Sequence, residues 1–566
     1  MGIFTALINV LALTGSLYML QVYDRVIPSH SVPTLVGMTV LMVGLYVVYG
    51  VLDFIRARVM VRVGLRVEKQ LRERVFACVQ ELPLRLKPSS DPLLPLRDLD
   101  HVRSFLSGMG PTALFDVPWM PMYLGLVYLL HPWLGALALA GAIVLVMLTT
   151  ATEVRSRRPM AKAARSGSER QAAADIARRS AEAAHAMGFA GHARQAWIRA
   201  NNAHLQDQTA AADAAMGLVT ISRVFRLLLQ SAILGLGAWL AIRGEASGGV
   251  MIAASILTSR ALAPIEVAIA NWRGFVAARQ AGRRLGKLLS SLPEKPKSMQ
   301  LPPPARRLSV EGLWVAPPGS SSPVLQNVSF ALEAGAGLGI VGPSASGKTT
   351  LARALVGIWD AMPNRGSVRL DGASIGQWDP ENLGRHIGYL PQDLQLFEGS
   401  IMANICRQDP NATSDAVIAA AMAAGAHDLI VRMPNGYDTQ IGDGGSVLSA
   451  GQRQRIALAR ALYADPFLVV LDEPNSNLDG AGEAALARAI TEARARGAIV
   501  IVIAHRPSAL SSVDQVLFLV DGKVRAFGPK DQVLRAIPGD PNAAGGGQTH
   551  ARAPGLKVIA DTAAGS

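Results

Sequence analysis

Six apolar stretches of about 20 residues constrain the fold of this 566-residue chain most strongly, because each is long enough to cross a lipid bilayer. They cover residues 3–23, 34–55, 112–130, 133–152, 218–242 and 249–270. A chain in hydrocarbon must satisfy its backbone hydrogen bonds internally, so these stretches are predicted to be helices. Residues 3–23 lack the basic start and small-residue cleavage site of a signal peptide, and we interpret them as the first span.

Basic residues predict the orientation of these spans. Seven Lys and Arg residues lie within 56–74 and four within 155–162, whereas the loops at 24–31, 131–132 and 243–249 carry few charges. Because Lys and Arg are enriched on the cytoplasmic side, both chain ends are predicted to be cytoplasmic. The formal net charge of +13 therefore reflects membrane topology and not nucleic-acid binding, since the basic residues do not interleave with exposed aromatic residues.

The two long cytoplasmic segments, 56–111 and 153–217, are rich in Ala, Arg, Glu and Gln and have helical periodicity. They are predicted to extend the membrane helices into the cytoplasm. Residues 82–95 and 188–197 interrupt this periodicity, and we interpret them as turns that contact the second domain. Ordinary solvated bends are the alternative interpretation.

Composition divides the chain into four parts. We predict a six-helix membrane domain at 1–292, a proline-rich linker at 293–304, an α/β domain at 305–540 and a disordered, Ala- and Gly-rich tail at 541–566. The only cysteines, Cys78 and Cys406, are far apart in sequence and indicate neither a disulfide framework nor a cysteine metal site.

A glycine-rich loop begins the chemistry of the α/β domain. It reads Gly342, Pro343, Ser344, Ala345, Ser346, Gly347, Lys348 and Thr349, followed by Thr350. This pattern binds nucleoside triphosphates when it joins a strand to a helix, as residues 338–341 and 349–356 predict here. Backbone N–H groups and Lys348 are then expected to hold the phosphates of ATP, and the Thr349 hydroxyl to ligate Mg²⁺. The alternative, a chance glycine-rich turn, does not require this strand and helix.

A second predicted strand, 467–471, ends in two carboxylates, Asp472 and Glu473. Asp472 is expected to hold Mg²⁺ through water, and Glu473 to polarise the water that attacks the γ-phosphate. A solvated acidic turn is the alternative. It is disfavoured because the phosphate loop precedes this strand in the same domain.

Between these motifs lies Leu448-Ser449-Ala450-Gly451-Gln452, followed by a predicted helix. Here the chain resembles the ATP-binding cassette (ABC) family, whose signature reads Leu-Ser-Gly-Gly-Gln, with Ala450 as a one-methyl departure. The resemblance implies that Ser449, Gly451 and Gln452 contact nucleotide. Because the signature of one cassette closes on the phosphate loop of another, it also implies a homodimer with two shared ATP sites.

Further positions match the cassette pattern in order. Gln392 corresponds to the Q-loop glutamine, a catalytic and Mg²⁺-contacting residue, residues 475–479 to the D-loop, and His505 to the switch histidine. Cassettes often place an aromatic residue against adenine. This chain has Pro317 at that position, with Trp314 three residues earlier.

Five stretches narrow the resemblance to the type I secretion ATPases of the protease-secretion kind: 17–29, 115–119, 131–133, 390–393 and 471–479. This implies an inner-membrane homodimer, surrounded by lipid, that exports an unfolded protein with a C-terminal signal. It also implies a periplasmic membrane-fusion adaptor and an outer-membrane channel as partners. No peptidase domain precedes the first span, so leader cleavage is not expected.

Other functions remain as alternatives at this point. An exporter of lipid, glycan or small molecules shares the six spans and the cassette but lacks these five characteristic sequence stretches. A soluble cassette ATPase acting on nucleic acid conflicts with the membrane spans. A membrane scaffold that binds ATP without turnover conflicts with the presence of Glu473 and His505.

Three arginines lie inside the last two predicted spans: Arg223 and Arg226 near the inner end of the fifth span, and Arg260 well inside the sixth. An arginine at the bilayer centre costs about 2.5–3.5 kcal/mol on insertion scales, so each is expected to face a wet cavity or an ionic partner. Asp116 and Glu266 are candidate partners. The functional alternative is an electropositive translocation path for acidic polypeptides, opened by a kink at Pro264.

Overall fold

The computed structural model describes residues 2–85, 93–293, 301–504, 510–536 and 557–558. These residues fall into two compact units, a helical first half and an α/β second half, which are described one at a time.

The helical unit contains six helical segments long and apolar enough to span a membrane, each including one predicted span. They are α1 to α3 (Gly2–Leu11, Thr14–Gln21 and Ile27–Ser29) with the π-helix η1 (Val22–Val26), α4 (Val32–Arg85), α6 (Gly110–Asp116) with η2 (Val117–Trp119) and α7 (Met120–Leu130), α8 (Pro132–Arg179), α10 (Ala190–Ile242), and α11 (Gly248–Ala270). The predicted six-helix fold class is confirmed.

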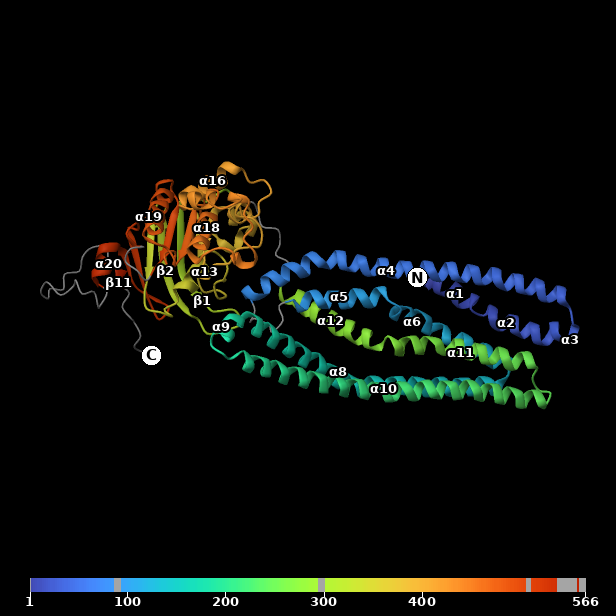
Figure 1. Ribbon diagram of the computed structural model, residues 1–566. Helices are drawn as coiled ribbons and strands as arrows, with labels where there is room; N and C mark the ends of the chain where they lie inside the picture. The colour runs from blue at the N-terminus through green and yellow to red at the C-terminus, as the bar shows by residue number, and fades with distance from the viewer. Residues whose placement is uncertain (1, 86–92, 294–300, 505–509, 537–556, 559–566) are drawn as a thin grey trace. The chain divides into compact units, whose positions relative to one another are not determined.

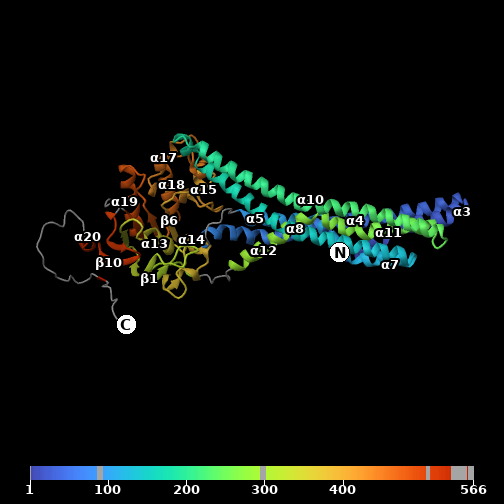
Figure 2. The same cartoon turned by 90° about the horizontal axis from the view of Figure 1, so that it is seen from below.

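Three of these helices, α4, α8 and α10, continue well beyond the predicted spans. Antiparallel α8 and α10 lie side by side along their length (Figure 1 and Figure 2). A short helix, α9 (Ala181–Ala186), and a turn at Gly188, with φ of +73°, connect them. The predicted turn at 188–197 is therefore placed too late, because helix resumes at Ala190 and the Ala-rich residues after it join α10. Of the other predicted turn, 86–92 lie outside the described residues.

Two further helices, α5 (Leu94–Ser107) and α12 (Trp272–Ser291), pack against each other. Helix α11 runs without interruption through Pro264, and the break comes later, at Asn271, before α12 begins. The core between α7, α8, α10 and α11 contains fully buried Leu134, Ile233 and Leu262.

Ion pairs compensate some of the charged side chains in or near the predicted spans. Arg226 pairs with Glu266, as one alternative expected. Asp116 instead pairs with Arg56, whose Nη1 lies 3.0 Å from Asp116 Oδ1, and it also accepts a 3.0 Å hydrogen bond from Asn9 Nδ2. Asp116 is therefore bound to the first and second spans through these two side chains.

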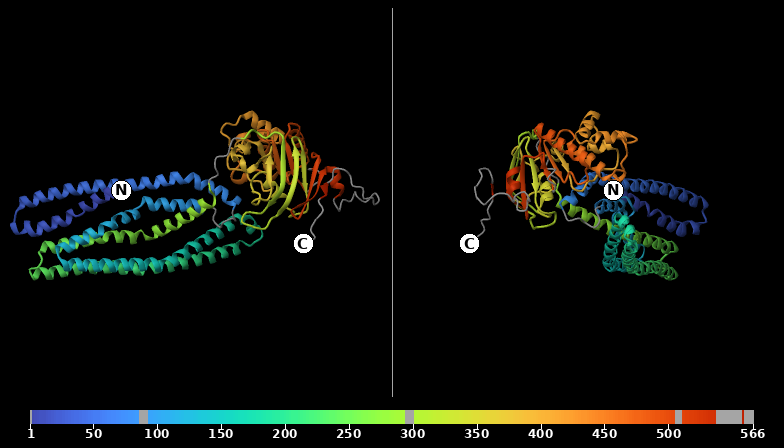
Figure 3. Two further views of the ribbon diagram at one scale, coloured as in Figure 1. Left: turned by 180° about the vertical axis from the view of Figure 1, so that it is seen from behind. Right: turned by 60° about the vertical axis from the view of Figure 1, so that its left-hand side comes forward.

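The α/β unit contains two sheets, whose strands lie next to one another in Figure 3. The four-stranded antiparallel sheet has the order β2 (Leu325–Glu333), β1 (Arg307–Val315), β4 (Ser367–Leu370) and β5 (Ala373–Ser374). The seven-stranded sheet has the order β11 (Lys557–Val558), β10 (Lys523–Pro529), β9 (Gln515–Val520), β3 (Gly337–Val341), β8 (Ile499–Ile503), β7 (Leu468–Asp472) and β6 (Ile387–Leu390). Strands β9, β3, β8, β7 and β6 are parallel, as expected for an α/β nucleotide-binding fold.

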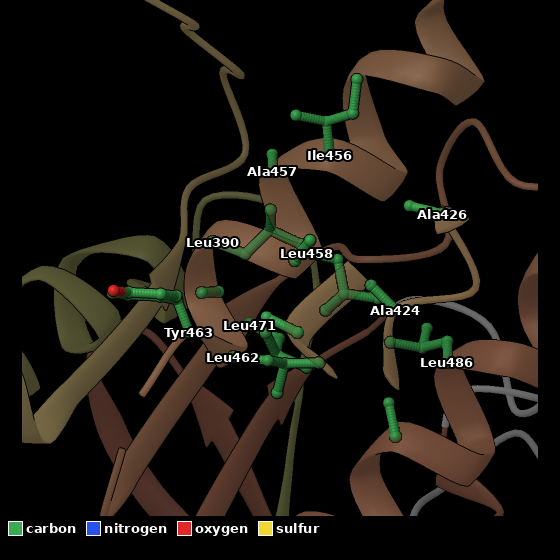
Figure 4. Close-up of a cluster of buried hydrophobic side chains, with 14 of the residues drawn as sticks. Leu390, Ala424, Ala426, Ile456, Ala457, Leu458, Leu462, Tyr463, Leu471 and Leu486 are labelled. Atoms are coloured by element: carbon green, nitrogen blue, oxygen red, sulfur yellow. The ribbon is translucent and has the colours of Figure 1, made fainter. Parts of the chain in front are cut away.

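Helices cover the larger sheet. They are α13 (Lys348–Leu355), α14 (Pro380–His386), α15 (Ile401–Ile405), α16 (Ser414–Ala423), α17 (His427–Val431), α18 (Ala450–Leu462), α19 (Gly480–Ala495) and α20 (Lys530–Ala536), with short 3₁₀ turns η3 (Ile375–Gln377), η4 (Gly436–Asp438) and η5 (Asp443–Gly445). Figure 4 shows part of the core that this packing forms, where Leu458 and Leu462 of α18 lie near Leu390 and Leu471 of two strands. Of the predicted tail, only the two residues of β11 are described, and they pair with β10.

Candidate nucleotide-binding site

The register of the larger sheet brings the two predicted phosphate motifs to one edge. Strand β8 pairs with β3 on one side and with β7 on the other, and Ile503 is level with both Ile340 and Asp472. Because these strands are parallel, their carboxyl ends lie at the same edge, where open α/β sheets bind ligands. The loop after β3 and the carboxylates at the end of β7 therefore meet.

The phosphate loop closes on the side chain of Lys348. Its Nζ donates hydrogen bonds of 2.9 Å to the carbonyl oxygens of both Gly342 and Pro343. Burial lowers the pKa of Lys348, while the nearby carboxylates of Glu473 and Asp472 oppose that shift. Lys348 is thus held at the start of α13, where backbone N–H groups point out of the helix.

Glycine is required at both ends of this loop. Gly347 caps α13 with φ of +98°, and a Cβ there would lie 2.9 Å from Leu325 Cδ2. At Gly342 a Cβ would lie 2.1 Å from the carbonyl oxygen of Leu519. Ala345 also has a left-handed backbone, with φ of 64°, which costs an alanine about 1–2 kcal/mol.

A pocket of about 370 Å³ opens above the loop. Its lining comprises Val324, Ser344, Ala345, Ser346, Gly347, Lys348, Thr349, Thr350, Gln392 and Glu473. The structure thus brings together the predicted loop residues, the Q-loop glutamine and the second carboxylate. Gly342 and Pro343 do not line the pocket, but their carbonyl oxygens accept hydrogen bonds from Lys348, which does.

Asp472 lies buried at the end of β7, and neither carboxylate oxygen has a hydrogen-bond partner among the described residues. Burial raises the pKa of Asp472, although the nearby Thr349 hydroxyl and the positive charges of Arg353 and Lys348 lower it. The buried Ser346 hydroxyl also lacks a partner there. A buried carboxylate with two unpartnered oxygens beside a threonine hydroxyl fits the oxygen ligands that Mg²⁺ prefers.

Glu473 follows immediately with a left-handed backbone, φ of 52°, and its N–H donates a 2.9 Å hydrogen bond to the carbonyl of Ile503. This conformation ends the strand and leaves Glu473 in the lining of the pocket. Such backbone conformations cost a non-glycine residue roughly 1–3 kcal/mol and cluster at functional sites. The structure therefore separates the two adjacent carboxylates into one buried and one pocket-lining group.

The signature residues form the N-terminus of α18 and do not line this pocket. Ser449 and Gln452 make a reciprocal capping box: Ser449 Oγ accepts from the Gln452 N–H at 3.3 Å, and Gln452 Oε1 accepts from the Ser449 N–H at 2.8 Å. A Cβ at Gly451 would lie 3.0 Å from the Asn477 carbonyl oxygen, so glycine permits the helix start to approach the D-loop.

One residue of this region was missed by sequence reasoning. Gln454 is buried in α18, and its Nε2 donates to the carbonyls of Pro474 and, at 3.4 Å, Glu473. Its Oε1 accepts from the Asn477 N–H at 2.9 Å. The next residue, Arg455, pairs with Asp479 at 2.5 Å. The position of Gln454, two residues after the end of the signature, was the one signal available.

His505 lies outside the described residues. Neither Trp314 nor Pro317 is part of the pocket lining, and the Trp314 ring is instead covered by the Arg365 guanidinium at 4.8 Å. Val324 is the apolar side chain that lines the pocket before the loop.

Comparison with known proteins agrees with both halves of the chain. The family described as "ABC transporter transmembrane region" matches residues 1–263, and the family described as "ABC transporter" matches residues 325–476. The type I secretion system ATP-binding protein PrsD of Rhizobium meliloti (strain 1021) is 53% identical over 536 residues, which cover 95% of this chain and 92% of that protein.

More distant relatives also match nearly the whole of this chain. The leukotoxin translocation ATP-binding protein LktB of Mannheimia haemolytica is 30% identical over 94% of this chain and 75% of its own length. A solved structure of a bacterial Atm1-family ABC exporter with ATP bound superposes with a TM-score of 0.80, covering 94% of this chain and 95% of that one at 21% identity. That superposition supports the fold.

Proposed function

This chain belongs to the ABC transporters of type I secretion systems, and from that premise we propose that two copies share two Mg²⁺-ATP sites that drive the export of unfolded proteins. The chain is a multi-pass protein of the bacterial inner membrane with a cytoplasmic ATPase domain, and it couples ATP hydrolysis to protein export. The roles of individual residues, the shared sites, the cargo and the partners are our proposal.

The observation that carries the proposed chemistry is the arrangement around Asp472. Its oxygens have no hydrogen-bond partner in the part of the chain that the structure describes, and it lies near Lys348 and Thr349, which line the pocket with Gln392 and Glu473. We assign Mg²⁺ to Thr349, Asp472 and Gln392, which would hold the ion where it would neutralise charge on the phosphates. Lys348 and the loop N–H groups hold the phosphates, and Glu473 orients the attacking water and accepts its proton.

The sites are shared because the signature residues of a chain do not reach its own pocket. Ser449, Gly451 and Gln452 cap α18 away from the pocket lining, and Ser449 with its neighbouring N–H groups forms a helix N-terminus suited to an anion. In the proposed dimer each signature closes on the phosphate loop of the other copy. His505 is assigned to the same sites, on its order in the sequence alone.

Mixed dimers test this arrangement. Ser449→Arg and Lys348→Ala each inactivate both sites of a homodimer. A heterodimer with one lesion per chain has one doubly damaged site and one intact site, so it should recover roughly half or less of the parental hydrolysis, depending on how far one site works alone. Hydrolysis no higher than in either homodimer, in heterodimers purified through two different tags, would contradict shared sites. A heterodimer with both lesions on one chain is the matched control.

The cargo and partners follow from the secretion family. We propose an unfolded polypeptide with a C-terminal signal as cargo, and a periplasmic membrane-fusion adaptor and outer-membrane channel as partners. Support comes from the full-length similarity to PrsD. Secretion of a reporter fused to candidate C-terminal segments, with each partner deleted in turn, tests this part separately from ATP hydrolysis.

A further inference from the structure

We propose that the cytoplasmic end of the membrane domain binds the headgroup of an anionic phospholipid, in two adjoining cavities between α8, α10 and the α11–α12 break. The cavities measure about 240 and 300 Å³ and share the lining residues Val219, Ile269 and Ala270. Because three residues border both cavities, a single ligand can occupy them together.

The depth of the cavities matches that of lipid headgroups. The spanning helix α11 ends at Ala270, the predicted fourth span ends at residue 152 and the predicted fifth begins at 218. Lining residues come from all three of these ends, including Thr149, Thr152 and Val219. This is the cytoplasmic side by the distribution of Lys and Arg, where anionic lipids concentrate.

The polar side chains that line the two cavities carry a net positive charge. Arg226 is neutralised by Glu266, but Arg223 and Arg273 have no ion pair among the described residues. The indole N–H of Trp272 is buried at the same place and has no acceptor in the part of the chain that the structure describes. The two non-bridging oxygens of a phosphodiester would accept from this donor and from the guanidinium groups through charge-assisted hydrogen bonds.

The apolar part of the lining distinguishes a lipid from other anions. Leu145, Ile265, Met160 and Met216 complete the walls and suit the glycerol backbone and first methylenes of acyl chains. Inorganic phosphate shares the anionic chemistry but gains nothing from these walls. An acidic segment of cargo is the other competing ligand, and it predicts a different experimental outcome.

The test uses the full chain in nanodiscs of phosphatidylcholine with a minor fraction of phosphatidylglycerol, followed by gentle detergent extraction and mass spectrometry of the retained lipid. Arg223→Gln and Trp272→Phe should each reduce retained phosphatidylglycerol roughly five- to tenfold and leave phosphatidylcholine unchanged. Trp272→Phe removes the N–H donor and keeps an aromatic, although smaller, ring. Arg273→Gln, at an exposed residue, provides a third variant should Trp272→Phe disturb folding.

Arg243→Gln is the matched control, because Arg243 follows the other end of α10 and lies 3.8 Å from the Trp239 ring. It should leave both lipids unchanged. Unaltered phosphatidylglycerol in the Arg223, Trp272 and Arg273 variants overturns the proposal, as does displacement of the lipid by millimolar inorganic phosphate. Lower cargo secretion with unchanged lipid retention assigns the site to acidic polypeptide and overturns it too. The lipid-retention measurement itself needs neither cargo nor ATP hydrolysis. A failure of the lipid proposal is therefore distinguishable from a failure of the proposed function.

Discussion

The side-chain oxygen of Gln454 accepts a 2.9 Å hydrogen bond from the backbone N–H of Asn477, which joins the signature helix to the D-loop of the same chain. The amide nitrogen of Gln454 donates to the carbonyls of Glu473 and Pro474, directly before that loop. These contacts join α18 to the backbone on which Glu473 lies. In a dimer with shared sites, this contact links the signature that serves one nucleotide to the carboxylate that serves the other.

We therefore expect Gln454→Glu to lower kcat for ATP hydrolysis about tenfold while the Kd for ATP changes less than about twofold. A carboxylate cannot donate to the two carbonyls, whereas the P-loop pocket is untouched. Steady-state hydrolysis and equilibrium nucleotide binding measure the two effects. Gln440→Glu is the control, since Gln440 is exposed and, among the described residues, its side chain donates only to the Asp438 carbonyl. Equal kcat in both variants would show that Gln454 does not position the site.

Glu473→Gln should stop turnover and leave ATP binding intact, because a positioned base contributes about 10²–10⁴ in rate. Lys348→Ala should instead weaken binding, since it removes the charge that faces the phosphates. Single-turnover hydrolysis with radiolabelled ATP separates the two effects. Parental hydrolysis in Glu473→Gln would mean that another group accepts the proton.

Asp472→Asn should stabilise the nucleotide-free ATPase domain at neutral pH and abolish its stabilisation by Mg²⁺-ATP. Burial raises the folded pKa of Asp472 above the ordinary value of about 4. Its contribution to stability is then fully present below pH 4 and is lost as the pH rises through the folded pKa. Thermal unfolding across that window, with and without Mg²⁺-ATP, measures both effects. A lower apo transition temperature in Asp472→Asn would contradict this account.

Arg260→Gln tests the translocation path. Arg260 is exposed on α11, unlike Arg226, which is paired with Glu266. We expect cargo secretion to fall severalfold while cargo-free ATP hydrolysis persists, because an electropositive path attracts acidic polypeptides. Arg260→Lys, which keeps the charge, should retain most secretion. Unchanged secretion in Arg260→Gln, or loss of the folded dimer, would remove Arg260 from the path.

The sequence predicted correctly those features whose physical requirements are all met within one short stretch of residues. A span must satisfy its own backbone in hydrocarbon, so a run of apolar residues predicts each membrane helix. The phosphate loop joins a strand to a helix within residues 338–356, and Asp472 ends a five-residue strand that Glu473 follows. The sequence pattern misplaced the boundary after α9, where helix resumes at Ala190, inside the predicted turn at 188–197.

The sequence by itself thus determined the six spans, the phosphate loop, the carboxylate pair and the family, because each is a local pattern. Only the tertiary structure decided which distant groups meet. Arg407 donates to the carbonyls of Gly384, Ile387, Arg460, Ala461 and Tyr463, and no spacing in the sequence indicates this. Arg226 reaches Glu266 and Gln454 reaches Asn477 for the same reason: hydrogen bonds and ion pairs depend on distances set by packed helices and sheet register.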